Sequence, residues 1–205
     1  MKPIILPLVA CLLIASGCTN RHTEPAARTL QNITLPVDFS RVSIRDGFWS
    51  PRLEKLSDST LPVCIDQIEN RTGRIRNFEN AAKGSGKHSG IFFDDSDVYK
   101  ALEGISYSLI NHPDPMLRRT ADQWVAKIAA AQQPDGYINT YYTLTGLDKR
   151  WTDMDKHEMY CAGHMIEAGI AYLLATGDRT LLEVSTRMVG HIMNEFGPGK
   201  RHWVP

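Results

Sequence analysis

The segment from Trp151 to Gly177 combines a helical period with side chains that can do chemistry. At 100° per residue, its small and chemically capable residues lie on one side of a helix and its larger apolar residues lie opposite. The first side holds His157, Tyr160, Cys161, His164, Ala168, Ala171 and Ala175, and the second holds Met159, Ile166, Ile170 and Leu173. A solvated face would carry Lys and Glu. The first side is nearly uncharged, so we predict that it forms the wall of a cavity and that the apolar stripe packs against other helices.

The order of residues in HEMYC argues against a zinc site on this helix. A zincin helix needs a second His four residues after the first, and Cys161 stands there instead. Ligands at His157, Cys161 and His164 would extend about 10 Å along the axis, too far for one tetrahedral ion. We therefore predict no metal ligands here and expect His157, Tyr160 and His164 to bind substrate. The alternatives are a helix-capping role for His157 and buried, hydrogen-bonded groups at Cys161 and His164.

The segment IFFDDSDVYKALE places two aromatic rings beside several carboxylates. Phe92 and Phe93 can stack on a sugar ring while Asp95 and Asp97 accept hydrogen bonds from its hydroxyl groups. We predict Asp95 and Asp97 as substrate-binding residues. The alternative is helix capping by Ser96 or Asp97, with the acidic groups stabilised by the helix dipole.

The composition is that of an ordinary globular domain, with no excess of positive or negative charge. The chain has 205 residues, of which 22% are charged and 42% hydrophobic, and its formal net charge is +0. Since no stripe of Lys and Arg stands out, we expect no nucleic-acid partner.

The first residues are typical of an export signal. Residues 1–18 contain Lys2, an apolar run from Ile4 to Ile14 that is too short to span a bilayer, and then Ala15, Ser16, Gly17 and Cys18. This ending is similar to a bacterial lipobox, which predicts lipidation at Cys18 and a periplasmic or outer-membrane lipoprotein, with free secretion as the alternative. Residues 19–36 are expected to form a tether. In an exported chain, Cys64 and Cys161 form a disulfide or remain free thiols.

The pattern after the tether predicts a mainly α-helical fold. We expect a short strand around Val42, Ile44 and Phe48 that ends at a turn, and a long loop over 71–90. Between them we expect a helix from Leu53 to Asn70, in which Pro62 marks a break or a new first turn. Two helix hairpins follow, separated by a loop with a turn at Asp135 and Gly136. Their periodic positions are Val98, Leu102, Ile105 and Leu109; Leu117, Ala121, Trp124 and Ile128; and Leu181, Ser185, Met188 and Ile192.

Specific residues begin and end these helices. Asp114 can cap a helix that has Pro115 in its first turn, Gly177 ends the helix of the HEMYC segment, and Asp178 can cap its successor. Repeated hairpins indicate an α/α toroid, which needs more helix pairs than the chain contains. We therefore expect an N-terminal piece of a longer protein.

Several long motifs occur in an order that resembles glycoside hydrolase family 127, the β-L-arabinofuranosidases. They are VSIRDGFWSPR, GIFFDDSDVYKALEG, NHPDP, AQQPDGYINTYY, HEMYCAGHMIEAGIAYLLATGD and FGPGK. The resemblance covers residues 37–205 and implies the N-terminal part of an (α/α)6 barrel that removes terminal β-L-arabinofuranosyl units from plant glycans by a retaining exo mechanism.

The resemblance also implies roles for residues. The His that opens HEMY contacts the sugar in this family, and here it is His157. The family uses a zinc-bound cysteine as nucleophile, with further cysteines and a glutamate as ligands, and these are expected downstream of Pro205. The catalytic residues are therefore expected outside this chain, and Cys161 is not assigned as the nucleophile. The expected partner is an arabinose-containing oligosaccharide or polysaccharide.

Two other functions compete with this interpretation. One is a different α/α-toroid enzyme, an unsaturated glycuronyl hydrolase or a polysaccharide lyase, in which Asp95 or Asp135 would have a larger role. The other is a surface lipoprotein that binds glycan without cleaving it.

Overall fold

The computed structural model describes residues 35, 37 and 39–201. The predicted signal segment 1–18 with Cys18, and nearly all of the tether at 19–36, lie outside the described residues. One compact unit spans Val37–Pro205. Its α-helices are α1 Ser50–Lys55, α2 Leu61–Asp66, α3 Arg74–Lys83, α4 Asp95–Asn111, α5 Pro115–Ala131, α6 Thr140–Thr145, α7 Glu158–Thr176 and α8 Thr180–Glu195. Short 3-10 turns lie at Phe39–Arg41, Leu147–Lys149 and Met154–Lys156, and π turns at Leu56–Thr60 and Gln67–Arg71 flank α2.

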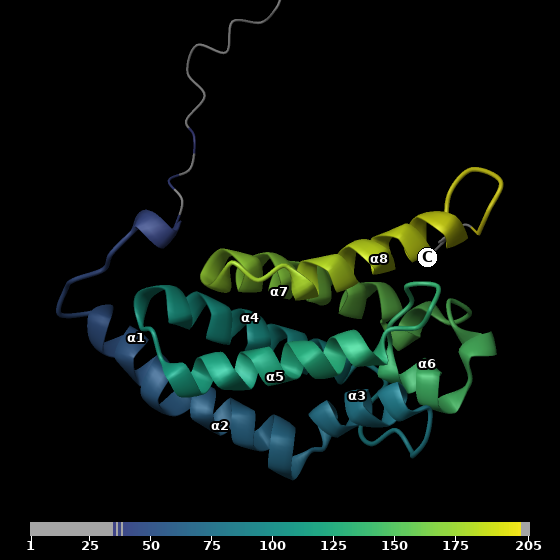
Figure 1. Ribbon diagram of the computed structural model, residues 1–205, viewed down its shortest axis with the longest axis horizontal. Helices are drawn as coiled ribbons and strands as arrows, with labels where there is room; N and C mark the ends of the chain where they lie inside the picture. Colours follow the sequence, from purple (N-terminus) through teal and green to yellow (C-terminus); the bar gives the residue numbers. More distant parts are fainter. Residues whose placement is uncertain (1–34, 36, 38, 202–205) are drawn as a thin grey trace, which may run out of the picture. The chain divides into compact units, whose positions relative to one another are not determined.

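The two predicted hairpins are confirmed as α4–α5 and α7–α8 (Figure 1). The Asp114 carboxylate accepts hydrogen bonds from the backbone N–H groups of Met116 and Leu117 and so caps α5, which has Pro115 in its first turn. Gly177 ends α7 with φ 74°, a conformation that favours glycine. The Asp178 carboxylate accepts a hydrogen bond from the backbone N–H of Thr180, the first residue of α8.

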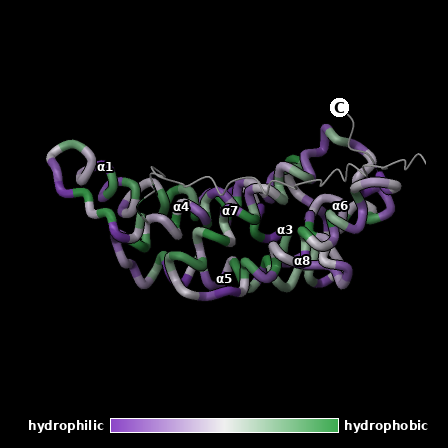
Figure 2. Tube along the Cα trace, turned by 90° about the horizontal axis from the view of Figure 1, so that it is seen from above, coloured by the Kyte–Doolittle hydropathy of each residue, from purple (hydrophilic) through white to green (hydrophobic). Residues whose placement is uncertain are grey.

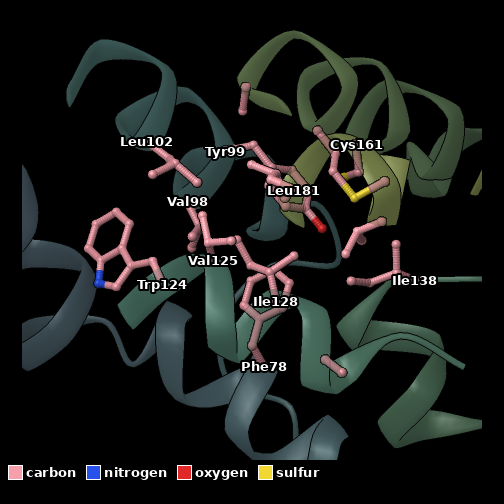
Figure 3. Packing of buried hydrophobic residues seen from close by; sticks show 14 of the residues in the cluster. Phe78, Val98, Tyr99, Leu102, Trp124, Val125, Ile128, Ile138, Cys161 and Leu181 are labelled. Carbon is pink, nitrogen blue, oxygen red and sulfur yellow. The ribbon is translucent and has the colours of Figure 1, made fainter. Parts of the chain in front are cut away.

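The hairpins pack as layers around a single apolar core. The most extensive helix contacts are those of α4 with α7, α7 with α8, and α3 with α5. Side chains from α3, α4, α5, α7 and α8 meet in the core (Figure 3). Hydrophobic and hydrophilic residues alternate along the helices, as amphipathic packing requires (Figure 2). This arrangement of neighbouring helix hairpins is that of an α/α toroid.

The predicted packing of α7 is wrong. On its small side, Cys161, Ala168 and Ala171 are buried in helix packing, whereas His157 and Tyr160 at its start line a pocket. Ile170, on the predicted packing stripe, is 47% exposed. Small residues let α4 and α8 approach closely: a Cβ on Gly169 would lie 3.3 Å from the carbonyl oxygen of Leu181. Close helix contact therefore explains the small side, and the helix itself begins at Glu158, after turns over 151–157.

Three further elements differ from prediction, and one of them is the short helix α6, which lies between the hairpins where a loop was predicted. The strand around Val42 to Phe48 is absent: residues 42–45 have no regular structure, and the Asp46 carboxylate accepts N–H groups of the following bend. The predicted loop over 71–90 contains α3, because Ile75, Phe78 and Ala81 recur every three residues and are buried. Three apolar residues among many polar ones gave too weak a period to detect.

Within residues 39–201, Cys64 and Cys161 are free thiols. None of the helices in this part of the chain has the length and apolar character needed to cross a membrane.

Candidate functional site

His157, the residue immediately before α7, has a backbone conformation that few non-glycine residues adopt. Its φ of 62° and ψ of 26° are left-handed, which costs about 1 kcal/mol or more for a residue with a Cβ. Its Nδ1 lies 2.6 Å from the carbonyl oxygen of Asp155. A carbonyl oxygen only accepts, so Nδ1 carries the proton and Nε2 has the free lone pair. Within the described residues Nε2 has no hydrogen-bond partner, and it can accept a ligand hydroxyl.

Aromatic rings surround this imidazole. The ring centroids of Phe92, Phe93 and Tyr160 lie 5.9, 5.2 and 5.6 Å from that of His157. Phe92 also contacts Tyr141, with 6.2 Å between the ring centroids. The rings hold the imidazole in place and offer apolar faces of the kind on which sugar rings stack.

A pocket of about 210 Å³ opens beside His157. Its lining consists of Met154, Asp155, His157, Met159 and Tyr160. Pockets for drug-sized ligands measure about 300–1,000 Å³, so this volume fits a single sugar unit better than a long ligand.

Tyr160 and His164 continue from His157 along α7. The Tyr160 and His164 ring centroids are 4.5 Å apart, and the Lys100 ammonium of α4 donates a hydrogen bond to the Tyr160 hydroxyl. Tyr160 is 43% exposed and can contact a ligand in the pocket. His164 is part-buried, one turn further from it, and forms an ion pair with Glu167 if the imidazole is protonated.

Glu158 anchors the backbone on which His157 lies. Its side chain is buried, its Oε1 accepts a hydrogen bond from the Tyr137 hydroxyl, and its Oε2 accepts the Trp151 backbone N–H at 2.7 Å. Burial raises the pKa of Glu158 to about 7, although these two hydrogen bonds act to lower it. No local sequence pattern indicates this role, because a Glu in the first turn of a helix is usually solvated and stabilised by the helix dipole.

The Asp95 carboxylate forms hydrogen bonds within the protein and is not among the residues that line the pocket. Only 2% exposed, it accepts hydrogen bonds from the backbone N–H of Thr140 at 2.7 Å and from the Thr140 hydroxyl. Burial raises the pKa of Asp95 to about 6. The carboxylate thus ties the start of α4 to the start of α6. Its predicted contact with substrate stays a prediction, and that contact would compete with Thr140.

Asp97 lies in a different cluster from His157. Its carboxylate is paired with the Arg74 guanidinium of α3 at 3.1 Å, and the same guanidinium lies 3.2 Å from Asp94. The predicted caps are not formed: the N-cap position of α4 is Asp94, which precedes Asp95, Ser96 and Asp97. The structure therefore groups His157, Tyr160 and His164 and places Asp97 in a separate ion-pair cluster.

The described residues do not fit a zinc-thiolate centre. Burial raises the pKa of the Cys161 thiol well above its usual value, so it is protonated at neutral pH, and its Sγ lies 3.7 Å from the carbonyl oxygen of Phe93. Within residues 39–201, the one group of three His, Cys, Asp or Glu side chains with ligand atoms close together contains no cysteine and consists of Glu103, His164 and Glu167.

Comparisons with known proteins give one consistent result. The family described as "Beta-L-arabinofuranosidase, GH127 catalytic domain" matches residues 41–205. A curated relative, the non-reducing end beta-L-arabinofuranosidase of Bifidobacterium longum subsp. longum, is 36% identical, and the match covers 78% of this chain and 28% of the relative.

Two solved structures are similar in fold. One is Ara127N-Se, a GH127 beta-L-arabinofuranosidase from Geobacillus stearothermophilus T6, with a TM-score of 0.74 and 40% identity over 77% of this chain and 26% of that chain. The other is the GH127 beta-arabinofuranosidase BT3674, with a TM-score of 0.75 and 37% identity over 83% of this chain and 29% of that chain. The chain therefore spans less than a third of the length of the relatives it matches.

Proposed function

Because the chain belongs to the GH127 β-L-arabinofuranosidase catalytic-domain family, we propose that it forms the sugar-binding part of a retaining glycosidase. The substrate is a terminal β-L-arabinofuranosyl unit at the non-reducing end of a plant glycan. The observation that carries this proposal is His157, whose Nε2 is free beside a pocket of sugar size.

His157 orients the sugar through a hydrogen bond. The carbonyl of Asp155 fixes the imidazole tautomer, so that Nε2 accepts a proton from a sugar hydroxyl. Phe92 and Phe93 limit ring rotation, which lowers the entropy lost when the ligand binds. Tyr160 extends the polar wall of the pocket.

Covalent catalysis is not assigned to the described residues. The family resemblance implies zinc bound by cysteines, and a bound zinc thiolate would supply the nucleophile. The protonated Cys161 and the free Cys64 do not provide such a donor set. The described residues therefore bind and orient the sugar, and we derive no reaction step from them.

We also propose that the protein is exported and anchored through a lipid on Cys18. The basis is the sequence of residues 1–18, with its short apolar run and its lipobox-like end. Labelling with a radioactive fatty acid in the native cell should mark the wild type and not the Cys18→Ala variant. Equal labelling of both proteins would refute the lipid site.

Hydrolysis of a chromogenic β-L-arabinofuranoside by the native protein tests the sugar-binding proposal. Loss of one polar contact to the substrate costs about 1–3 kcal/mol, so His157→Ala should lower kcat/KM about 5- to 150-fold. His112→Ala, which removes the part-buried imidazole at the end of α4, is the matched control and should retain activity. Unchanged hydrolysis in His157→Ala would remove that residue from the site.

A further inference from the structure

A second cluster of ligand-type side chains lies between α4 and α7. It contains Glu103 of α4 together with His164 and Glu167 of α7, and one ligand atom of each lies within 4.8 Å of the others. The spacing of three residues puts His164 and Glu167 on the same side of α7. Glu103 reaches them because α4 and α7 form the most extensive helix contact in the described part of the chain.

The imidazole in this cluster lacks a hydrogen bond at a buried atom. Nδ1 of His164 is shielded from solvent and lies 3.0 Å from Oε2 of Glu167, its ion-pair partner when the imidazole is protonated, but the two atoms lack hydrogen-bond geometry. Two ligand atoms that each lie about 2.0–2.2 Å from a metal ion lie about 3–3.5 Å from each other. The separation of Nδ1 and Oε2 falls in this range, as expected for two ligands of one ion. The nitrogen and the carboxylate oxygen are therefore close enough to bind one ion.

Neither carboxylate in the cluster, that of Glu103 or that of Glu167, is paired with the cationic side chain of a Lys or Arg in the described residues. A divalent cation would neutralise the negative charge of these two carboxylates and bind the His164 nitrogen as well.

We propose that Glu103, His164 and Glu167 bind one divalent cation of the Zn²⁺ type. Two carboxylate oxygens and one imidazole nitrogen form a donor set that suits zinc, with water completing the coordination. This site contains no cysteine, so it differs from the zinc-thiolate centre implied by the family resemblance, and it does not depend on the proposed function.

A metal here would link α4 to α7. It would also hold His164 beneath the Tyr160 ring, whose centroid is 4.5 Å away, and so brace the wall of the sugar pocket. Its role is structural: it fixes two helices and does not touch the sugar.

Calorimetric titration of the 205-residue chain with ZnCl₂ tests the proposal. We expect about one equivalent to bind and to raise the melting temperature, because binding to the folded state stabilises it. Glu103→Gln and His164→Ala should each weaken zinc binding at least about tenfold, since both remove a ligand. Glu167→Gln changes an exposed side chain, which makes it the variant safest for folding, and it should weaken binding as well.

Two controls separate this site from other zinc ligands. His112→Ala removes an imidazole outside the cluster, and Cys64→Ser removes a part-exposed thiol. Both variants should bind zinc as the wild type does, and circular dichroism should show native helix content in every variant. The proposal is overturned if the wild type binds no zinc below about 1 mM, or if the three cluster variants bind it with wild-type affinity.

Discussion

The buried carboxylate of Glu158 accepts the backbone N–H of Trp151 at 2.7 Å. Trp151 has φ 61°, and His157, the residue before Glu158, has φ 62°; in the described part of the chain they are the two non-glycine residues with positive φ. One side chain thus fixes both ends of a segment with strained backbone. The Tyr137 hydroxyl, which donates to the other carboxylate oxygen, joins the preceding loop to the same anchor.

Removing this anchor should destabilise the fold and displace His157. Glu158→Ala leaves the Trp151 N–H and the Tyr137 hydroxyl buried without an acceptor, at a cost of about 1–3 kcal/mol for each unsatisfied group. Glu158→Gln keeps one acceptor oxygen and should cost less. Urea unfolding measures both values. The exposed Glu183→Gln on α8 is the control, and equal stability of Glu158→Ala and wild type would contradict the role given to Glu158.

The same residue should make stability depend on pH. Burial raises the folded-state pKa of Glu158 from 4.5 to about 7, so between these values the folded protein binds more protons than the unfolded chain. The contribution is therefore fully present below about pH 4.5 and is lost as the pH rises through 7. Asp95, with its pKa raised from 3.8 to about 6, acts in the same direction.

We expect the free energy of unfolding to fall between pH 5 and pH 7.5, as measured by urea titration at several pH values. In Glu158→Gln, which cannot titrate, the fall should be smaller, with the part above pH 6 most reduced. A wild-type stability that rises through this range would show that the buried carboxylates do not control it.

Asp95 offers a test between a structural and a ligand-binding role. Thr140→Val removes the hydroxyl that donates to Asp95 and keeps the backbone N–H, so it should cost about 0.5–1.5 kcal/mol of stability. If Asp95 acts only as a tie between α4 and α6, Thr140→Val and Asp95→Asn should lower stability and leave sugar affinity unchanged. A loss of sugar affinity in Asp95→Asn alone would support the contact predicted from the sequence.

The close contact of α7 with α8 predicts opposite effects for two glycines on one helix. A Cβ on Gly169 would lie 2.9 Å from the Ser185 hydroxyl oxygen and 3.3 Å from the Leu181 carbonyl oxygen, whereas Gly163 has no atom within 4 Å of that position. Gly169→Ala should destabilise the protein by about 1–3 kcal/mol through overpacking. Gly163→Ala should stabilise it by about 0.5–1 kcal/mol through helix propensity. Thermal unfolding of both variants tests these two predictions. A stabilising effect of Gly169→Ala would contradict the close contact of α7 with α8.

Periodicity predicted the helices that bury wide apolar stripes and missed those that do not. Val98, Leu102 and Ile105 identified α4, and Asp114 with Pro115 located the start of α5, because local chemistry determines both features. The orientation of α7 was not predictable in this way. Its small residues favour close helix contact as well as a cavity wall, and only the neighbouring helices decide between the two.

In the candidate site too, features determined by local sequence could be predicted, and features determined by distant segments could not. His157 could be predicted from its place in HEMYC, and the structure adds the tautomer set by Asp155. The Asp95–Thr140 and Glu158–Trp151 hydrogen bonds depend on loops that fold back over the helix ends, so no local pattern indicates them. Both carboxylates anchor loops to helix ends.

A structure of the native protein with bound L-arabinofuranose, or with a non-hydrolysable β-L-arabinofuranoside, tests the central claim most directly. We predict that a sugar hydroxyl lies about 2.6–3.2 Å from Nε2 of His157, with the sugar in the pocket next to Tyr160. A sugar bound elsewhere, or bound here with Nε2 of His157 making no contact to it, would contradict the account.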